Sequence, residues 1–142
     1  MENSLSINEK YASKVALSTD QYFSNMLQEL KYSSNIISKD FSNQALIQQE
    51  LHRLKYQSNN FNSVSVIDST AHIRHLEPQL LKYDSKTIYK TVGIVESLKS
   101  KKTYISTPYK SIANNLIVLM SQPIYGPDQQ YLGMITGSLY LH

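Results

Sequence analysis

A chain of 142 residues is about the size of one ordinary domain, and the 41% of its residues that are hydrophobic suffice for a buried core. Its 14 basic and 11 acidic residues are spread along the sequence and give a formal net charge of only +3, so nucleic acid is not an expected partner. The absence of cysteine excludes disulfides, thiolate metal sites and cysteine catalysis.

Helical periodicity dominates the first sixty residues. Apolar or aromatic residues recur mostly three, four or seven positions apart, and this spacing predicts one long amphipathic helix. They are Ile7, Tyr11, Val15, Tyr22, Met26, Leu30, Ile37 and Phe41. The weak helix formers at 33–35 mark a plausible joint. A second helix is expected to begin after an Asn43 N-cap, to bury Leu51 and Leu54, and to end near Asn59.

Short β-rich runs separated by turn residues follow from residue 61. The expected elements are a hairpin of 61–68 and 72–76, a mixed crossover segment at 77–98 with a short helix from Ser85 to about Leu98, and three strands at 102–107, 115–124 and 131–141. This order predicts one α+β domain over residues 1–142. Its helical region is 1–60 and its sheet region is 61–142, with the long N-terminal helix packed on a five-stranded antiparallel sheet.

Three segments of the sheet region, taken in this order, resemble the Cache family of bacterial sensor domains. They are Ser63-Val64-Ser65-Val66-Ile67-Asp68-Ser69-Thr70-Ala71-His72-Ile73, Met120-Ser121-Gln122-Pro123-Ile124-Tyr125-Gly126 and Tyr131-Leu132-Gly133-Met134-Ile135-Thr136-Gly137. The resemblance covers most of the chain and implies a PAS-like form of the predicted fold. It also implies a small-molecule pocket on one face of the sheet and no catalytic activity in the domain itself.

The same resemblance implies a place in a membrane receptor. Such domains are extracytoplasmic parts of proteins anchored in the cell membrane, and they signal to a histidine kinase of a two-component system, a diguanylate cyclase or a chemotaxis module. The longest uninterrupted apolar stretch here, Leu116 to Met120, is far shorter than the ~18 residues of a membrane-spanning helix. The flanking transmembrane helices are therefore expected outside this sequence.

The sequence departs from the members of the family that bind amino acids and amines. Those members carry an arginine followed closely by Trp-Tyr in the crossover, and an aspartate in the last strand. The segment from Asp84 to Tyr89 contains neither arginine nor tryptophan, and Ser138 stands about where the aspartate would lie. Because a serine cannot supply the negative charge that holds an ammonium group, we expect a neutral pocket rich in tyrosine and not an amino-acid site.

Tyrosines are the main candidates for that pocket, since the chain has 11 tyrosines and no tryptophan. By the resemblance, Tyr89 and Tyr104 line the pocket between the crossover and the central strands, and Tyr109 lies at its rim. A phenol suits a small polar ligand because it offers an apolar face and a hydroxyl. The high strand propensity of tyrosine leaves the alternative that each is only a half-buried strand residue.

Three polar residues complete the predicted ligand-binding set. Arg74 is a candidate partner for a carboxylate-bearing ligand, with an exposed hairpin position as the alternative. Gln122 and Ser138 place polar groups inside apolar strands, where a ligand is one source of the hydrogen bonds that they need. For Gln122, a place on the solvent face of its strand is the alternative.

Catalysis and the binding of a metal or cofactor are not expected. No nucleophile–base pair, carboxylate pair or phosphate-binding loop has a recognisable spacing. The side chains of His72 and His75 would point to opposite faces of a strand, which prevents joint coordination of a metal. A rival function without any ligand is dimerisation through the N-terminal helix. Its first turns, with Ile7, Tyr11 and Val15, would pair with a second copy of the chain.

Overall fold

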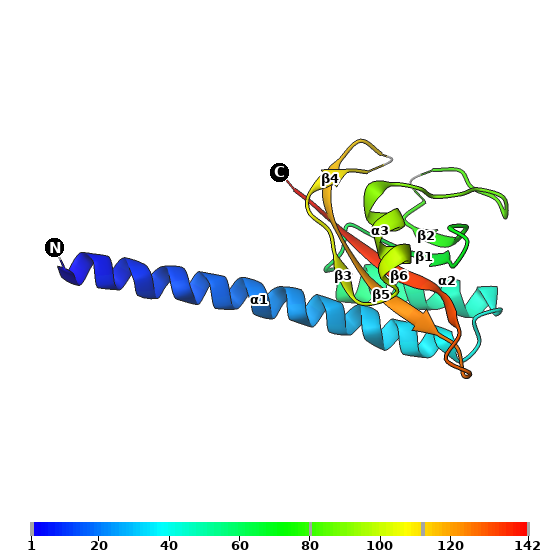
Figure 1. The fold of residues 1–142 in the computed structure, drawn as a ribbon, viewed down its shortest axis with the longest axis horizontal. Coiled ribbons are helices and arrows are strands. Elements are labelled where there is room, and N and C mark those ends of the chain that lie inside the picture. Colours follow the sequence, from blue (N-terminus) through cyan, green and yellow to red (C-terminus); the bar gives the residue numbers. More distant parts are fainter. Residues whose placement is uncertain (1, 80, 112, 142) are drawn as a thin grey trace.

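A computed structural model describes residues 2–79, 81–111 and 113–141, with side chains from residue 20 onwards. The elements are α1 (Glu2–Ser38), α2 (Gln44–Arg53), the π-helix η1 (Leu54–Ser58), β1 (Ser63–Asp68), β2 (Ile73–Glu77), α3 (Val92–Ser100), β3 (Tyr104–Ile105), β4 (Tyr109–Lys110), β5 (Leu116–Tyr125) and β6 (Tyr131–Tyr140). Figure 1 shows α1 and α2 together on one side of the sheet. The expected dimer contacts at Ile7, Tyr11 and Val15 lie outside the described side chains.

The strands form one sheet in the order β2-β1-β6-β5-β3, and every neighbouring pair is antiparallel. The long strands β5 and β6 make its centre, pairing from Ile117 with Tyr140 to Tyr125 with Tyr131. The two-residue strand β4, which the sequence did not predict, pairs with β5 beyond β3, so two short strands share that edge. The predicted α+β fold, a long helix on an antiparallel sheet of about five strands, is confirmed.

The two N-terminal helices bury one face of the sheet. The core there consists of Met26, Leu30, Ile37, Ile47, Leu51, Leu54, Phe61, Val64, Val66, Met120, Ile124 and Ile135. Helix α1 continues through the weak helix formers Ser33 and Ser34 because both have partners outside it: Ser33 Oγ donates to Glu50 Oε1 (2.8 Å) and Ser34 Oγ to the carbonyl of Pro123 (2.7 Å). Helix α2 begins after the N-cap Asn43, as predicted. No helix in the part of the chain that the structure describes has the length and apolar character required to cross a bilayer.

The opposite face of the sheet is covered by α3 and by the crossover, residues 81–91, which contains no helix or strand. This second core consists of Ile67, Ile73, Leu76, Ile94, Leu119 and Met134. Helix α3 begins at Val92, later than the predicted Ser85, because the crossover is held against the start of β2. The Tyr89 N–H donates to the carbonyl of Ala71 at 2.8 Å, which a helix from Ser85 would prevent.

Candidate ligand-binding sites

A row of small hydroxyl-bearing residues crosses the sheet face that α3 and the crossover cover. They are Ser63 and Ser65 of β1, Ser121 of β5, and Thr136 and Ser138 of β6, and all are buried. Ser65 and Thr136 hydrogen-bond to each other, and Ser121 Oγ donates to Ser97 Oγ of α3 at 3.0 Å. The row, hereafter the hydroxyl strip, is thus polar within an otherwise apolar layer.

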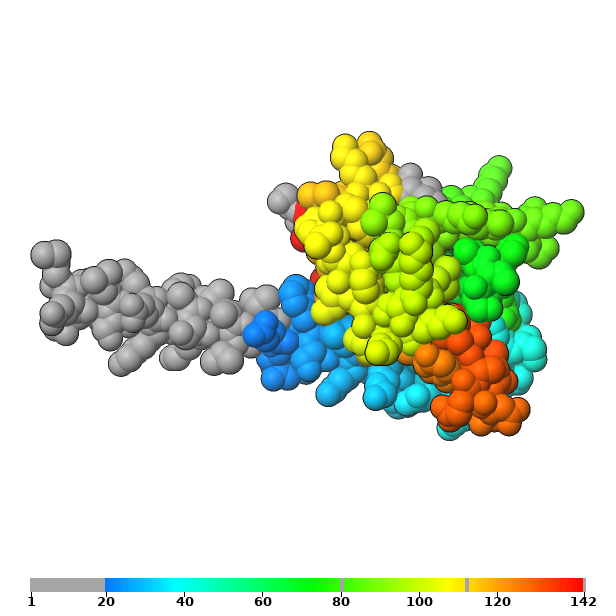
Figure 2. Space-filling view, in the orientation of Figure 1, coloured from blue at the N-terminus to red at the C-terminus, as the bar shows by residue number. Residues whose placement is uncertain are grey.

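A small cavity lies at one end of the hydroxyl strip, beneath the crossover. Its lining consists of Ser63, Leu81, Tyr89, Ser111, Ala113, Ile117, Ser138 and Tyr140, and none of these residues carries a charge at neutral pH. The cavity volume is about 10 Å³, which is room for about one water molecule. Figure 2 shows α3 and the crossover, in yellow-green, as the outer layer on this side of the protein. The strip is therefore closed off by that layer.

Two tyrosines at this end of the sheet are held in their neutral form by burial. Burial, together with the neighbouring Tyr109 and Tyr140, raises the pKa of Tyr89 to about 12. The Tyr109 hydroxyl lies 3.3 Å from Thr91 Oγ1, and its ring packs against Gly93 so closely that a Cβ there would not fit. Burial raises the pKa of Tyr109 as well, although its hydrogen bonds to Thr91 and Gly93 oppose this. Both hydroxyls are uncharged hydrogen-bonding groups at neutral pH.

The structure brings only part of the predicted pocket together. Tyr89 and Ser138 line the same cavity, with Tyr109 close to Tyr89. Tyr104 is half-buried on β3, where it pairs with Ser121 of the hydroxyl strip, and it does not line the cavity. The cavity therefore lies between the crossover and the central strands, and Tyr104 is not among its lining residues.

The amide of Gln122 is used within the protein. Gln122 follows Ser121 on β5 and so points to the opposite face of the sheet, towards α1. Its Nε2 donates to the carbonyl of Leu27 at 3.1 Å, and its Oε1 accepts from Thr103 Oγ1 at 2.6 Å. These bonds attach β5 to α1 and satisfy a buried amide without a ligand.

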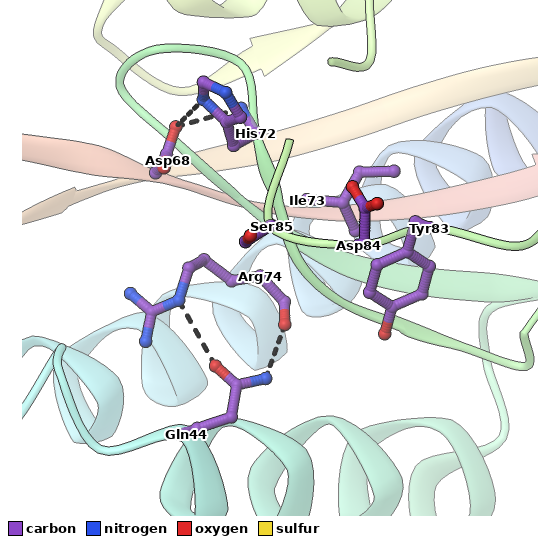
Figure 3. A pocket seen from close by; sticks show the side chains of 8 residues that line it. All are labelled: Gln44, Asp68, His72, Ile73, Arg74, Tyr83, Asp84 and Ser85. Carbon is purple, nitrogen blue, oxygen red and sulfur yellow. Dashed lines mark hydrogen bonds and ion pairs between the residues drawn. The ribbon is translucent and has the colours of Figure 1, made fainter. Parts of the chain in front are cut away.

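Arg74 lies in a second hollow, at the outer edge of β2, which we call the edge groove (Figure 3). The groove has a volume of about 360 Å³ and is lined by Gln44, Asp68, His72, Ile73, Arg74, Tyr83, Asp84 and Ser85. Its residues come from the start of α2, the end of β1 and the turn that follows it, β2 and the crossover. It shares no lining residue with the cavity at the hydroxyl strip, so the six predicted residues do not form a single site.

The histidines near the edge groove have separate partners. His72 Nδ1 lies 2.7 Å from Thr70 Oγ1, whereas His75 lies 3.0 Å from the Glu77 carboxylate and 3.1 Å from the Tyr83 hydroxyl. Among the described side chains, no group of three or more His, Asp and Glu residues is arranged to hold a metal ion.

Sequence reasoning missed most of the residues that line the cavity. Alternation along β1 places Ser63 and Ser65 on one face, and this signal was present in the sequence. The partner of Ser63, however, is Ser138, and that pairing depends on the register of two strands far apart in the chain. Leu81 and Tyr140 enter the lining through the same tertiary arrangement.

Several solved structures that match this fold are described as ligand-binding domains. The ligand-binding domain of Mlp24 with asparagine matches with a TM-score of 0.75 at 15% identity, over 93% of this chain and 55% of that one. The ligand-binding domain of the Pseudomonas fluorescens chemoreceptor CtaA in complex with L-isoleucine matches with a TM-score of 0.75 at 16% identity, over 90% and 52%. An extracellular ligand binding receptor from Desulfohalobium retbaense matches with a TM-score of 0.69 at 13% identity, over 89% and 24%.

The chain has the fold of the Cache-type sensor domains, as its sequence resemblance implied. It spans about half the length of the Mlp24 and CtaA structures and about a quarter of the third. The matched structures are described as ligand-binding domains and as an extracellular ligand binding receptor. No protein-family model matches the sequence. A search of the curated proteins likewise found no match.

Proposed function

We propose that the chain is an extracytoplasmic small-molecule sensing domain of a bacterial signal-transduction receptor that is anchored in the membrane outside this sequence. The fold supports a sensor, since chemoreceptor ligand-binding domains share it. A matched structure described as an extracellular receptor supports the location. The output partner is a histidine kinase, a diguanylate cyclase or a chemotaxis module.

The hydroxyl strip is the observation that carries this proposal. A sheet face buried under a helix is normally apolar, because an unpaired hydroxyl loses its hydrogen bonds to water. Here Ser63 and Ser138 face each other across β1 and β6 and line a cavity together with Tyr89. Polar groups that converge in a mostly apolar recess are the usual composition of a small-molecule site.

The ligand we propose for this cavity is small, polar and uncharged. A zwitterion would need opposite charges in the wall, since a buried ion without a partner is strongly unfavourable. The described lining offers only hydroxyls, backbone and apolar surface. The amino acid named with the CtaA structure is therefore not transferred to this chain.

Binding at the cavity requires the crossover to move outwards. A volume of about 10 Å³ cannot hold a sugar or a nucleobase. The sheet and α3 are regular elements, whereas residues 81–91 have no helix or strand and are held by few backbone bonds, including Tyr89 N–H to Ala71. We therefore expect the irregular parts of the cavity wall to move when a ligand binds, above all the crossover, and with it the segment that carries Ser111 and Ala113.

A thermal-shift screen of the purified chain tests the proposed function. The library would contain organic acids, amino acids, amines, sugars and nucleobases, because a ligand that binds only the folded state raises the unfolding temperature. We expect one neutral class to raise it, and we expect the rise to shrink in Tyr89→Phe and Ser138→Ala. Tyr32→Phe, which changes an exposed tyrosine on α1, is the matched control and should keep the full rise.

The same screen separates sensing from the rival function, dimerisation through α1. No rise with any class, combined with a dimer in equilibrium sedimentation, would replace the sensor by a helix-mediated interaction domain. A rise that persists unchanged in Tyr89→Phe and Ser138→Ala would place the ligand elsewhere on the protein.

A further inference from the structure

The guanidinium group of Arg74 is held in place but not neutralised. It lies 4.7 Å from the centre of the Phe41 ring, and its Nε donates to Gln44 Oε1 at 3.3 Å. Gln44 Nε2 in turn donates to the Arg74 carbonyl at 2.5 Å, so the two residues are bonded twice. Among the described residues, Arg74 forms no ion pair with a carboxylate. Its terminal nitrogens therefore remain available as a fixed fork of donors.

A β-bulge aims this side chain into the edge groove. The register between β1 and β2 runs from Val66 opposite His75 to Ile67 opposite Ile73, which leaves Arg74 without a residue opposite it. Such an extra residue bends the strand and redirects a side chain, and bulges are over-represented beside functional sites. Arg74 is consequently the one residue of β2 that is removed from the regular pairing of the described hairpin.

The rest of the edge groove offers hydrogen-bond acceptors at a distance from Arg74. Figure 3 shows Tyr83 and Asp84 on the opposite side of the view from the Arg74 guanidinium. Asp84 Oδ1 accepts from the Lys86 N–H at 2.8 Å, so this carboxylate is fixed by its own turn. A volume of about 360 Å³ lies within the range of small-molecule sites, in contrast to the cavity at the hydroxyl strip.

We propose that the edge groove is a second binding site, for a small organic carboxylate that also carries a hydrogen-bond donor at its other end. The carboxylate would accept two parallel bonds from the terminal nitrogens of Arg74. The donor would face Asp84 and Tyr83. The carboxylates of Asp68 and Asp84 beside the groove disfavour ligands with several negative charges, such as a phosphate ester.

Occupancy of the edge groove acts directly on the helical layer. Phe41 belongs to the connection between α1 and α2, and Gln44 is the first residue of α2. Both contact Arg74, so a ligand that draws the guanidinium towards itself shifts contacts at the end of α1. The site therefore goes beyond the proposed pocket, because it reaches α1 without passing through the sheet.

The test is an NMR titration of the chain labelled with ¹⁵N, using three probes of similar size. 4-Hydroxybutyrate has the carboxylate and the donor, butyrate lacks the donor, and 4-hydroxybutyramide lacks the charge. We expect 4-hydroxybutyrate to shift the Arg74 Nε–H signal and the backbone signals of 83–85, butyrate to bind more weakly, and 4-hydroxybutyramide to leave the Arg74 signal unchanged.

Variants assign the effect to Arg74. Arg74→Gln should weaken binding of 4-hydroxybutyrate roughly tenfold or more, as expected for the loss of hydrogen bonds to a charged group. Lys110→Gln removes the same charge from the exposed strand β4 and should leave the affinity unchanged. Arg74→Lys keeps the charge and should also bind weakly, and it serves if Arg74→Gln does not fold.

Three results would overturn the proposal: no shift of the Arg74 signal with 4-hydroxybutyrate, equal shifts with the amide, or equal losses in Arg74→Gln and Lys110→Gln. Tyr89→Phe distinguishes the two sites. Binding at the edge groove should be the same in this variant as in the unchanged chain, whatever happens at the hydroxyl strip.

Discussion

At Gly133, in the central strand β6, the structure leaves no room for any side chain. Its φ is +150°, and a Cβ would press against the carbonyl oxygen of Ile67 and lie 2.8 Å from the Cα of Asp68. Both are backbone atoms of the paired strand β1, so they cannot rotate away. We expect Gly133→Ala to lower the free energy of unfolding by on the order of 3 kcal/mol, measured by urea denaturation.

The matched control for Gly133 is Gly126, in the turn between β5 and β6. There a Cβ would meet only the end of the Gln130 side chain, which is flexible and exposed. Gly126→Ala should therefore lower the free energy of unfolding by less than about 1 kcal/mol. Equal effects of the two substitutions would contradict the close approach of β1 and β6.

Tyr89 makes the stability of the protein fall at high pH. Its pKa is about 12 in the folded chain, mainly because of burial, against about 10 in an unfolded chain. The folded state thus favours the neutral phenol, and this stabilisation is complete below about pH 10 and is lost as the pH rises towards about 12. Tyr89→Phe should reduce the loss by on the order of 1 kcal/mol, allowing for partial exposure of the ring.

Urea denaturation at about pH 8 and about pH 11.5 measures that loss. Part of the alkaline destabilisation should persist in Tyr89→Phe, because burial also raises the pKa of Tyr131 to about 12. Tyr32→Phe, at an exposed position, should behave as the unchanged chain does. If Tyr89→Phe and Tyr32→Phe lose the same stability between these two pH values, then Tyr89 is not shielded as described.

At the residue scale, the sequence predicted which side chains are unusual better than it predicted what they contact. Ser138 and Gln122 were both singled out as polar residues in apolar strands. The structure places Ser138 at a cavity and satisfies Gln122 with Leu27 and Thr103. Alternation alone could not separate the two, because it gives the relative faces of neighbouring residues but not which layer covers each face.

At the scale of elements, a partly buried ion pair joins α1 to α2. The Arg53 guanidinium lies 2.6 Å from Glu50 Oε1, which also accepts from Ser33 of α1, and the Glu50 side chain is only 8% exposed. The hydrogen bond to Glu50 raises the pKa of Arg53. Glu50→Gln keeps the shape but leaves the Arg53 charge without its partner, so we expect a loss of about 1–3 kcal/mol in the free energy of unfolding.

An exposed pair of the same spacing provides the control for Glu50. Glu96 lies 3.8 Å from Lys99 on α3, and both side chains are largely in water. Glu96→Gln should change the free energy of unfolding by less than about 0.5 kcal/mol. The double variant Glu50→Gln/Arg53→Met should regain part of the loss of Glu50→Gln, because no unpaired charge then remains at the interface. No recovery would indicate that packing, and not charge, stabilises this contact.

The order of the elements was predictable, whereas their ends depended on tertiary contacts. Period and turn residues predicted both N-terminal helices, the hairpin and the two long strands. The start of α3 was wrong by several residues, since the bond from Tyr89 to Ala71 holds the crossover in an extended form. Strand β4 is two residues long, Tyr109 and Lys110, and no periodicity can be read from so short a segment.

At the scale of the whole molecule, adjacent residues of β5 attach the two layers to the same sheet. Ser121 bonds to Ser97 of α3, and Gln122 bonds to the carbonyl of Leu27 on α1. A displacement of the layer formed by α3 and the crossover would therefore be transmitted through the Ser97–Ser121 bond to β5, the strand that also bonds to α1. Under the proposed function, the ligand would act on one face of the sheet while the long helix lies on the other.

Hydrogen exchange tests whether the crossover opens by itself. Strand β6 is paired with β1 and β5 along most of its length, and β5 is paired with β6 from Ile117 to Tyr125, so their bonded backbone amides should exchange only through global unfolding. The crossover has only a few backbone bonds, such as Tyr89 N–H to Ala71, and should exchange faster through local opening. A neutral ligand identified in the thermal-shift screen should then slow exchange in the crossover more than in β5 and β6, because it binds between crossover and sheet.

If the Tyr89 amide of the free chain exchanges as slowly as those of β5, the layer formed by α3 and the crossover does not open independently. A cavity of about 10 Å³ would then admit no such ligand. Of the two proposed sites, only the edge groove at Arg74, with about 360 Å³, would still be open to a ligand.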